Sequence, residues 1–391
     1  MPRPPALEPK EFNASIRLTG TEKHIVETRI RELGVSSIGE YVRRLIQQDG
    51  AEVQRKPVAA AGPKARLTRF LKMPGGTIWN GNSLDYMRKA DAKSVDLIVT
   101  SPPFGLVRKK SYGNEDAHNY CEWFRPYAEG FRKVLKEHGS LVIDVGGTWK
   151  KGTPTRSLYH FELLLMLCND YGFHLCQEHY WWNPSKLPAP AEWVNIRRVR
   201  VKDAVNCVWW LSPTPWPKAS NRRVLAPYSD SMRDLLVNGY YAKIRPSGHR
   251  ISKKFGTDNG GAVPPNLLAI ANTESNGVYQ DYCRKNGLTI HPARFPALLP
   301  EYFIRMLTDP GDKVLDPFAG SCVTGVVAEA LGRHWDCVEL SRDFLEGASG
   351  RFDGSVADNA ATKPSSYVIH TPCAVGASKG KLASDGGRSS A

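Results

Sequence analysis

The sequence lacks the features of a metal-binding, disulfide-bonded or membrane-spanning protein. None of its eight cysteines lies in a Cys-x-x-Cys pair, so we expect no metal site and no disulfide framework. No apolar run approaches the ~20 residues that cross a bilayer. Residues 1–10 also lack the apolar core of a signal peptide. We therefore expect a cytoplasmic protein with no membrane partner.

Acidic residues are scarce relative to basic ones. The chain has 39 Asp and Glu against 53 Lys and Arg, a formal net charge of +14 over 391 residues. This excess favours a polyanionic partner, with nucleic acid ahead of a membrane surface. The alternative is a basic enzyme whose charges form a solvated face. The length predicts two or three domains.

The first 50 residues read as a small unit of their own. Apolar and polar residues alternate over 12–18, which predicts a strand. Thr21 is expected to cap a helix that ends at Gly34, and Ser36 and Ser37 to cap a second helix. A strand and two helices of this size are too small to be stable alone.

The pattern of the first unit resembles the ribbon-helix-helix fold. That resemblance implies a homodimer in which two chains pair their strands, with Arg17 among the outward residues that enter the major groove of DNA. The alternative is an N-terminal element that only packs or dimerises, without touching DNA.

The rest of the chain has three parts. Residues 51–66 read as a flexible linker, and residues 67–352 form the body, with a basic, tryptophan-rich middle at about 180–290. Residues 353–391 are rich in Ser, Ala, Gly and Lys, which predicts a disordered tail.

The body contains an apolar strand, Val95–Thr100, that runs directly into Ser101-Pro102-Pro103-Phe104. Prolines cannot donate ladder hydrogen bonds, so the strand must end there. The loop offers fixed acceptors, the Ser101 hydroxyl and the Pro102 carbonyl, beside an aromatic ring. An amino group on a base needs acceptors, and its ring needs a stacking partner. The alternative is an ordinary proline-terminated strand.

A second strand leads into a loop of small residues. Lys313–Asp316 is followed by Phe318, Gly320 and Ser321 and then by a helix, and a further strand ends in Glu339. Gly320 permits close approach of a ligand, and a helix N-terminus favours an anion. An acid about 20 residues after such a loop is placed to bind ribose hydroxyls. The loop is not GxGxxG, which argues against NAD; the alternative is a βαβ unit without a ligand.

The two loops should lie side by side. In an open α/β sheet, ligands bind beyond the carboxyl ends of the strands at the point where the strand order reverses. The strands that carry Thr100 and Asp316 are expected to flank that point.

The motifs of the body resemble those of a known family. The proline motif precedes the glycine motif, as in the beta class of amino-methylating DNA methyltransferases. The runs 100–104, 182–188, 200–206 and 291–296 make residues 78–352 similar to the PvuII-type cytosine-N4 methyltransferases. The resemblance implies an α/β fold: a circularly permuted, Rossmann-like, S-adenosylmethionine-dependent methyltransferase sheet, with target recognition at about 180–290.

The resemblance also assigns residues to roles. The target base, flipped from double-stranded DNA, is expected on Ser101, Pro102, Pro103 and Phe104. S-adenosylmethionine is expected to contact Asn82, Ser83, Phe295, Pro296, Asp316, Phe318, Gly320, Ser321 and Glu339. In the body, DNA contacts are expected from Arg108, Lys109, Lys110, Lys186, Arg197, Arg198, Arg200 and Lys202. Arg17 joins them only through the separate ribbon-helix-helix resemblance of the first unit. Asn82 stands where the family carries Asp, and Cys322 where a glycine is common, which weakens the analogy at both places.

Direct transfer to an amino group fits these residues. Hydrogen bonds from the amine to Ser101 and Pro102 would localise its lone pair, and no covalent cysteine is required. Carbon-5 methylation usually uses a Pro-Cys dipeptide, and the only one here, Pro372-Cys373, lies in the tail. Ser101 favours cytosine N4, whereas adenine N6 is the nearest alternative; an inactive DNA-binding regulator is another. The resemblance further implies the site CAGCTG, a cognate restriction endonuclease and a nucleoid location.

Overall fold

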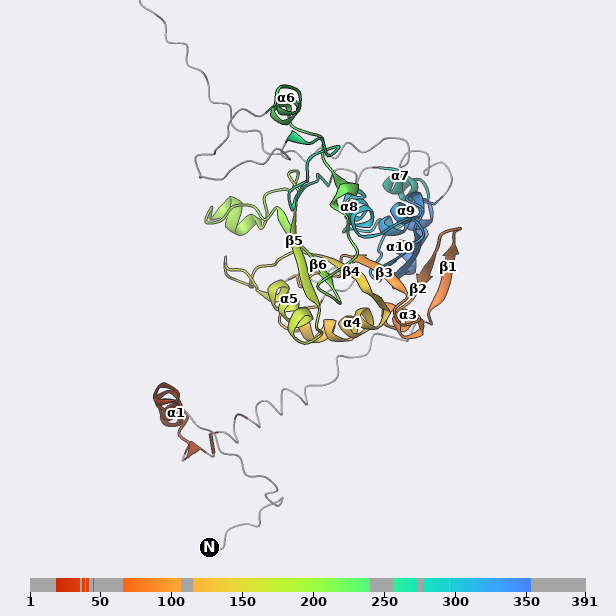
Figure 1. Cartoon of the computed structure of the whole chain (residues 1–391). Helices are drawn as coiled ribbons and strands as arrows, with labels where there is room; N and C mark the ends of the chain where they lie inside the picture. The colour runs from red at the N-terminus through yellow and green to blue at the C-terminus, as the bar shows by residue number, and fades with distance from the viewer. Residues whose placement is uncertain are drawn as a thin grey trace, which may run out of the picture. The chain divides into compact units, whose positions relative to one another are not determined.

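The computed structural model describes residues 19–35, 37, 38, 40, 41, 45, 66–106, 115–239, 256–272, 277–294 and 296–352. The chain divides into two compact units, Met1–Gly62 and Pro63–Ala391 (Figure 1). The expected strand at 12–18 with Arg17, the linker up to residue 65, Arg108 to Lys110, Phe295 and the tail from residue 353 lie outside the described residues.

The first unit contains helix α1 (Gly20–Leu33). Its N-cap is Thr19, whose side chain and backbone exchange hydrogen bonds with Glu22 in a capping box. The expectation that Thr21 caps this helix is wrong by two residues, because the capping box needs the acid three positions after the cap, and Glu22 stands there relative to Thr19. The helix ends at Gly34, which adopts the left-handed conformation with φ of 65°, as predicted. Ser37 accepts a hydrogen bond from the backbone of Glu40, as a second cap should.

The second unit is built on one mixed sheet. The described strands are β1 (Thr68–Lys72), β2 (Gly76–Asn80), β3 (Val95–Thr100), β4 (Leu135–Val145), β5 (His174–Trp182), β6 (Val205–Ser212), β7 (Leu267–Ala269), β8 (Lys313–Asp316) and β9 (His334–Glu339). Their order is β1-β2-β9-β8-β3-β4-β6-β5-β7. Strands β2, β9, β8, β3 and β4 are mutually parallel, whereas β1 and β6 run antiparallel to their neighbours β2 and β4.

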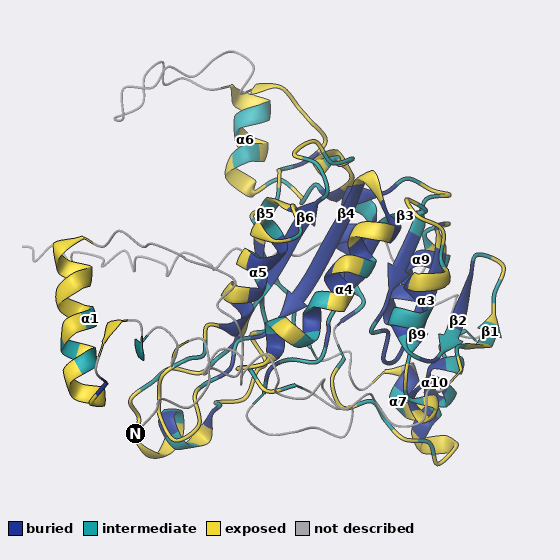
Figure 2. Cartoon of the chain, turned by 90° about the horizontal axis from the view of Figure 1, so that it is seen from below, coloured by how far each residue is buried: buried dark blue, intermediate teal, exposed yellow. Residues whose placement is uncertain are grey.

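Helices cover both faces of the sheet (Figures 1 and 2). Helices α3 (Ser83–Lys89), α4 (Tyr120–Val134) and α5 (Tyr159–Asn169) pack on one face; α8 (Leu298–Leu307), α9 (Val323–Ala330) and α10 (Arg342–Ser349) lie on the other, next to α7 (Val278–Lys285). Alternation along β4 explains the two cores, since Leu141 and Ile143 join one and Val142 joins the other.

The basic middle of the chain does not form a separate domain. It supplies β6, β7 and the end of β5 to the main sheet. It also contains a π-helix (Glu192–Ile196), a 3-10 helix (Asn221–Val224) and α6 (Asp230–Asn238). Residues expected to recognise the target are therefore tied directly to the strands that border the site.

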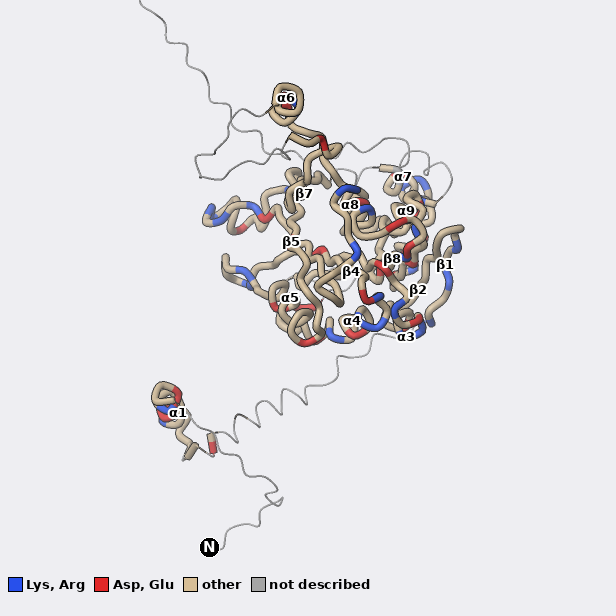
Figure 3. The backbone as a smooth tube through the Cα atoms, viewed as in Figure 1, with Lys and Arg blue, Asp and Glu red and all other residues tan. Residues whose placement is uncertain are grey.

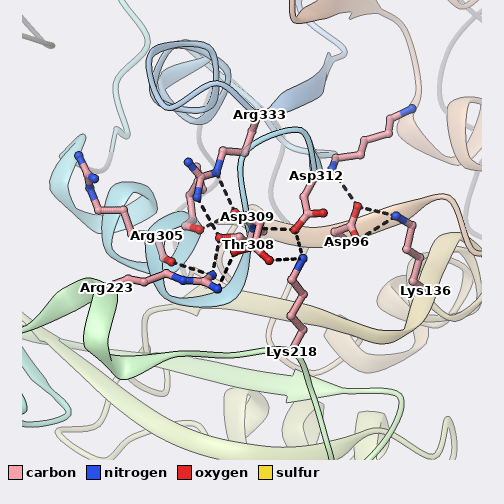
Figure 4. Close-up of polar contacts among 11 residues, drawn as sticks. Asp96, Lys136, Lys218, Arg223, Arg305, Thr308, Asp309, Asp312 and Arg333 are labelled. Atoms are coloured by element: carbon pink, nitrogen blue, oxygen red, sulfur yellow. Dashed lines mark hydrogen bonds and ion pairs between the residues drawn. The ribbon is translucent and has the colours of Figure 1, made fainter.

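An ion-pair network braces the amino ends of the parallel strands (Figure 4). Lys218, which follows β6, lies 2.7 Å from Asp309 and 2.5 Å from Asp312, and Arg223 lies 2.6 Å from Asp309. Arg333 is buried and donates to the hydroxyl and the carbonyl of the neighbouring Thr308. Because this network precedes β8 in the chain, it lies at the end of the sheet opposite to the two sequence motifs, which follow β3 and β8.

The described residues show neither a membrane-spanning helix nor a cluster of metal ligands. No helix among them is long and apolar enough to cross a membrane. They also contain no group of three or more His, Cys, Asp or Glu placed to hold a metal ion.

Candidate active site

The two sequence motifs meet at the point where the strand order reverses. Strands β3 and β8 are adjacent, while the chain continues from β3 to β4 on one side and from β8 to β9 on the other. Asp316 links the two motifs, because its carboxylate accepts from the hydroxyl of Thr100 at 2.7 Å. The same carboxylate accepts from Phe318 N at 3.1 Å and from the Thr324 hydroxyl at 2.7 Å.

Asp316 is turned into the protein. Its side chain is 1% exposed, and both carboxylate oxygens accept hydrogen bonds from the chain itself. Burial raises the pKa of Asp316 to about 6, although its three hydrogen bonds lower it. This geometry gives Asp316 a role in joining the loops, whereas the sequence predicts that it lines a ligand pocket.

Ser101 has a partner that the sequence reasoning missed. Its hydroxyl donates to Asp144 Oδ2 at 3.1 Å, and the side-chain amide of Asn206 donates to Asp144 Oδ1 at 3.0 Å. Asp144 lies at the end of β4 and is buried, so burial raises its pKa to about 6. Because the Ser101 proton points to Asp144, the lone pairs of Ser101 Oγ remain free to accept a hydrogen bond from a ligand.

The proline loop has little room behind it. Pro102 is buried, and Ser101, Pro103 and Phe104 are partly exposed. The ring of Phe104 packs so closely on Gly146 that a Cβ at residue 146 would lie 2.5 Å from it. Only glycine at residue 146 therefore lets the Phe104 ring take this position. The ring and the Ser101 hydroxyl form the aromatic and accepting parts of one small site.

The glycine loop is shaped by its neighbours. Gly320 has φ of 51°, and a Cβ there would lie 3.1 Å from the ring of His291. Its N–H donates to Glu339 Oε2 at 2.8 Å, and Ser341 N donates to Glu339 Oε1 at 2.8 Å. Burial raises the pKa of Glu339, against these two hydrogen bonds, which lower it.

Glu339 fits the role of binding a vicinal diol. Each of its oxygens accepts one backbone hydrogen bond, and each has a second lone pair to offer to a hydroxyl. Asn82 lies close by, since β2 and β9 pair in parallel with Asn80 opposite Glu339. The Asn82 side chain caps α3 by accepting from Leu84 N at 2.9 Å.

The other residues expected to bind the cofactor differ in burial and in what they pack against. Ser83 and Pro296 are buried, and Ser321 is buried with its hydroxyl 3.3 Å from Arg351 Nη2. The Phe318 ring packs against Tyr127, with centroids 4.9 Å apart, and so reaches toward α4. Phe295 lies outside the described residues.

The basic residues before β6 fall into two groups. Lys186, Arg197 and Arg198 are exposed, and Arg197 also pairs with Glu192 and stacks over Trp193. Arg200 is bound to Asp203, and the exposed Lys202 donates to the carbonyls of Pro184 and Lys186, which favours bracing over direct phosphate contact for these two. The segment that carries all five residues extends from the end of β5 (Figure 3).

Arg200 belongs to a cluster with Asp203 and Arg156, which we call the Asp203 cluster. Arg200 Nη2 lies 2.8 Å from Asp203, and Arg156 Nη1 lies 2.5 Å from the same carboxylate. Arg156 comes from a hairpin whose exposed tip carries Lys150 and Lys151. Sequence reasoning missed this hairpin, although two adjacent lysines beside Gly152 give a weak signal for it.

The fold and the two adjacent loops fit the predicted class of DNA methyltransferases, and comparison with known proteins supports the same class. Residues 95–349 match the family model described as DNA methylase. The chain belongs to this family and is a DNA methyltransferase. The predicted α/β methyltransferase fold and the predicted membership of the PvuII-type group are thereby confirmed.

Individual relatives make the likeness specific. The chain is 50% identical over 291 residues to type II methyltransferase M.PvuII of Proteus hauseri, covering 73% of this chain and 87% of that protein. It is 25% identical over 294 residues to type II methyltransferase M.BglII of Bacillus subtilis, covering 74% and 72%. A solved structure of PvuII DNA methyltransferase (cytosine-N4-specific) matches with 42% identity and a TM-score of 0.60, covering 74% of this chain and 91% of that one.

Proposed function

We propose that this protein transfers a methyl group from S-adenosylmethionine to N4 of a cytosine flipped out of double-stranded DNA. The observation that carries the proposal is the chain of contacts Asn206–Asp144–Ser101, which leaves Ser101 Oγ as an acceptor beside an aromatic ring. The 50% identity to M.PvuII supports the choice of cytosine N4, since a PvuII structure is titled cytosine-N4-specific.

The base loop acts by positioning an amine that is a weak nucleophile. Its lone pair is delocalised into the ring until hydrogen bonds to Ser101 Oγ and the Pro102 carbonyl turn it toward tetrahedral geometry. Ionised Asp144 keeps the Ser101 proton turned away from the amine and stabilises the positive charge that forms on N4. The electron pair of the broken sulfur–methyl bond stays on sulfur, and the methylated N4 then releases one proton to solvent to become neutral. Phe104 stacks on the base. A cytosine inside a duplex cannot reach this loop, so the base must flip.

S-adenosylmethionine supplies a sulfonium-activated methyl group when it is bound. Glu339 would bind its ribose hydroxyls, Asn82 and Ser83 would hold its adenine, and Gly320 and Ser321 would hold its methionine part. Pro296 and Phe295 are proposed as further cofactor-binding residues. The free lone pairs of Glu339 and the left-handed turn at Gly320 support this arrangement. Phe318 and Asp316 shape the pocket from behind.

The remaining parts of the proposal concern DNA and partners. DNA is bound by basic residues of the segment between β5 and β6, directly or by bracing it: Lys186, Arg197, Arg198, Arg200 and Lys202. Further DNA-binding residues are Arg108, Lys109 and Lys110 and, in the first unit, Arg17. The fold is a circular permutation, which the order of β3 before β8 supports. The first unit is a ribbon-helix-helix element that dimerises, which the exposed Ile25, Leu33 and Ile38 support. The enzyme belongs to a type II restriction-modification system with a cognate endonuclease and modifies CAGCTG.

Nucleoside analysis tests the proposal. DNA from cells that express the protein is digested and analysed by mass spectrometry, with sequencing at nucleotide resolution to locate the site. N4-methylcytosine is the expected product, and Ser101→Ala should lose most of the activity. N6-methyladenine alone would contradict the choice of base. A Ser101→Ala variant as active as the parent would contradict the assignment of the loop.

A further inference from the structure

The segment between β5 and β6 exposes four aliphatic side chains. Val201 is 85% exposed and Leu187 is 80% exposed, and Ile196 and Val199 are also largely exposed. Apolar side chains that gather in this way on a soluble protein mark a surface that binds something. The transfer step proposed above does not use them.

The backbone that presents Leu187 and Val201 is braced. Lys202, next to Val201, extends its ammonium group across the segment to the carbonyls of Lys186 and Pro184, at 3.0 and 3.3 Å. The two stretches of loop on which Leu187 and Val201 lie are therefore tied together beside both residues. A side chain that must push into a partner needs such a support, because a floppy loop would yield instead.

The Asp203 cluster adds a second brace on the other side of Val201. Asp203 holds Arg200 and also Arg156 of the neighbouring hairpin, and its N–H donates to the Ala189 carbonyl at 3.1 Å. Of the two basic residues that flank Val201, Arg200 is bound to Asp203 and the exposed Lys202 is bound to main-chain carbonyls, so both are held by the segment itself and the valine stands out between them.

This tip is joined to the base loop by a short stretch of chain. Val201 precedes Asn206 by five residues, and the Asn206 side chain holds Asp144, which accepts from Ser101. β6 begins at Val205, so only a short stretch separates the exposed valine from the residues that surround the flipped cytosine.

The charge around the tip identifies the partner as duplex DNA. Lys186, Arg197 and Arg198 are exposed on the same segment, and the chain carries a net charge of +14. Basic side chains contact phosphates and fix the register of a protein on a duplex. Apolar side chains among them enter between base steps in several classes of DNA-binding protein. A surface for a second copy of this chain would instead gain nothing from the concentrated positive charge.

We propose that Leu187 and Val201 form an apolar wedge that enters the duplex as the target base leaves it. The inference deepens the proposed function and rests on it. A flipped base leaves a gap in the stack, and the bare gap favours return of the base. Side chains that fill the gap stabilise the extruded state, so they raise the fraction of complexes in which the amine lies on the base loop.

The test compares two DNA duplexes and three variants. The duplexes carry the site that sequencing identifies, one intact and one with an abasic position opposite the target base, which removes the pairing that flipping must break. The variants are Leu187→Ala/Val201→Ala, the size-conserving Leu187→Met/Val201→Ile, and the control Leu165→Ala. Leu165 is an exposed leucine on α5 and lies outside the segment. Flipping is followed with 2-aminopurine next to the target, which brightens when its neighbour leaves the stack.

The double alanine variant should lose about tenfold or more in kcat/KM on the intact duplex, together with the 2-aminopurine signal. On the abasic-partner duplex it should match the parent, and the other two variants should match the parent on both duplexes. An equal loss on both duplexes, or no loss on either, would overturn the wedge. So would a changed oligomeric mass with an unchanged 2-aminopurine signal, which would assign the surface to a second copy. A parent that methylates neither duplex would overturn the proposed function itself, and the wedge with it.

Discussion

Replacing Asp316 tests whether this carboxylate joins the two loops or contacts the cofactor. In the structure it accepts hydrogen bonds from Thr100, Phe318 N and Thr324, at 2.7, 3.1 and 2.7 Å. Asp316→Ala leaves three buried donors without their acceptor, at roughly 1–3 kcal/mol each where no water enters. The expected loss of about 3–9 kcal/mol is a large part of a domain's stability of about 5–15 kcal/mol.

Asp316→Asn should behave very differently. Its amide oxygen can accept from Thr100 and Phe318 N, and its NH₂ can donate to the Thr324 hydroxyl, which turns to accept. We therefore expect a cost of about 1 kcal/mol or less at neutral pH, and cofactor binding close to that of the parent. The two variants together separate the loss of hydrogen bonds from the loss of charge.

The pH dependence of stability shows whether the pKa of Asp316 is raised or lowered by folding. Burial raises the pKa of Asp316 to about 6, above the roughly 3.9 of an unfolded chain. The folded state therefore holds the proton more tightly, so this contribution is complete below about pH 4 and is lost as pH rises through about 6. Two pKa units correspond to roughly 3 kcal/mol, which Asp316→Asn should no longer show. Relative to the parent, the variant should gain stability as pH rises from 4 to 7.

Urea unfolding followed by tryptophan fluorescence measures these differences. All ten tryptophans lie between residues 79 and 335, so the signal reports on the second unit alone. Isothermal titration with S-adenosylmethionine gives the affinity of the same samples. If Asp316→Asn abolishes cofactor binding while its unfolding free energy stays within about 1 kcal/mol of the parent, the reasoning fails. The carboxylate would then contact the cofactor, as the sequence alone predicts.

Three further changes probe separate parts of the site. The turnover of the parent should rise as pH passes about 6, where Asp144 loses its proton, and Asp144→Asn should remove that dependence and lower kcat about 100-fold in single-turnover assays. Gly320→Ala should raise the Kd for S-adenosylmethionine about tenfold by titration, because its Cβ meets the His291 ring; an unchanged Kd would contradict the close packing. Arg333→Met should lower the unfolding free energy by about 2–4 kcal/mol by removing buried hydrogen bonds. Since Arg333 lies at the far end of the sheet, the kcat of Arg333→Met should equal that of the parent. A large loss of kcat in this variant would contradict that placement.

The sequence by itself determined the paired strands and their loops. The apolar run before Ser101-Pro102-Pro103-Phe104 has to end as a strand at the prolines. The run Lys313–Asp316 is likewise a strand, which the small residues around Gly320 connect to a helix. The rules of parallel sheets then place the two ends together, and β3 and β8 are indeed neighbours. These features are local or follow from general topology, so no distant contact had to be known.

Tertiary structure alone decided how the buried polar groups are partnered. Asp144 is 43 residues from Ser101 and 62 from Asn206, and no spacing rule connects them. The same holds for Asp316, whose carboxylate is turned toward Thr100 across 216 residues of sequence. Residue type shows that a group can accept a hydrogen bond, but the donor that reaches it depends on which strands lie side by side. The physical reason is that every buried polar group needs a partner, and only the folded chain fixes which partner is near.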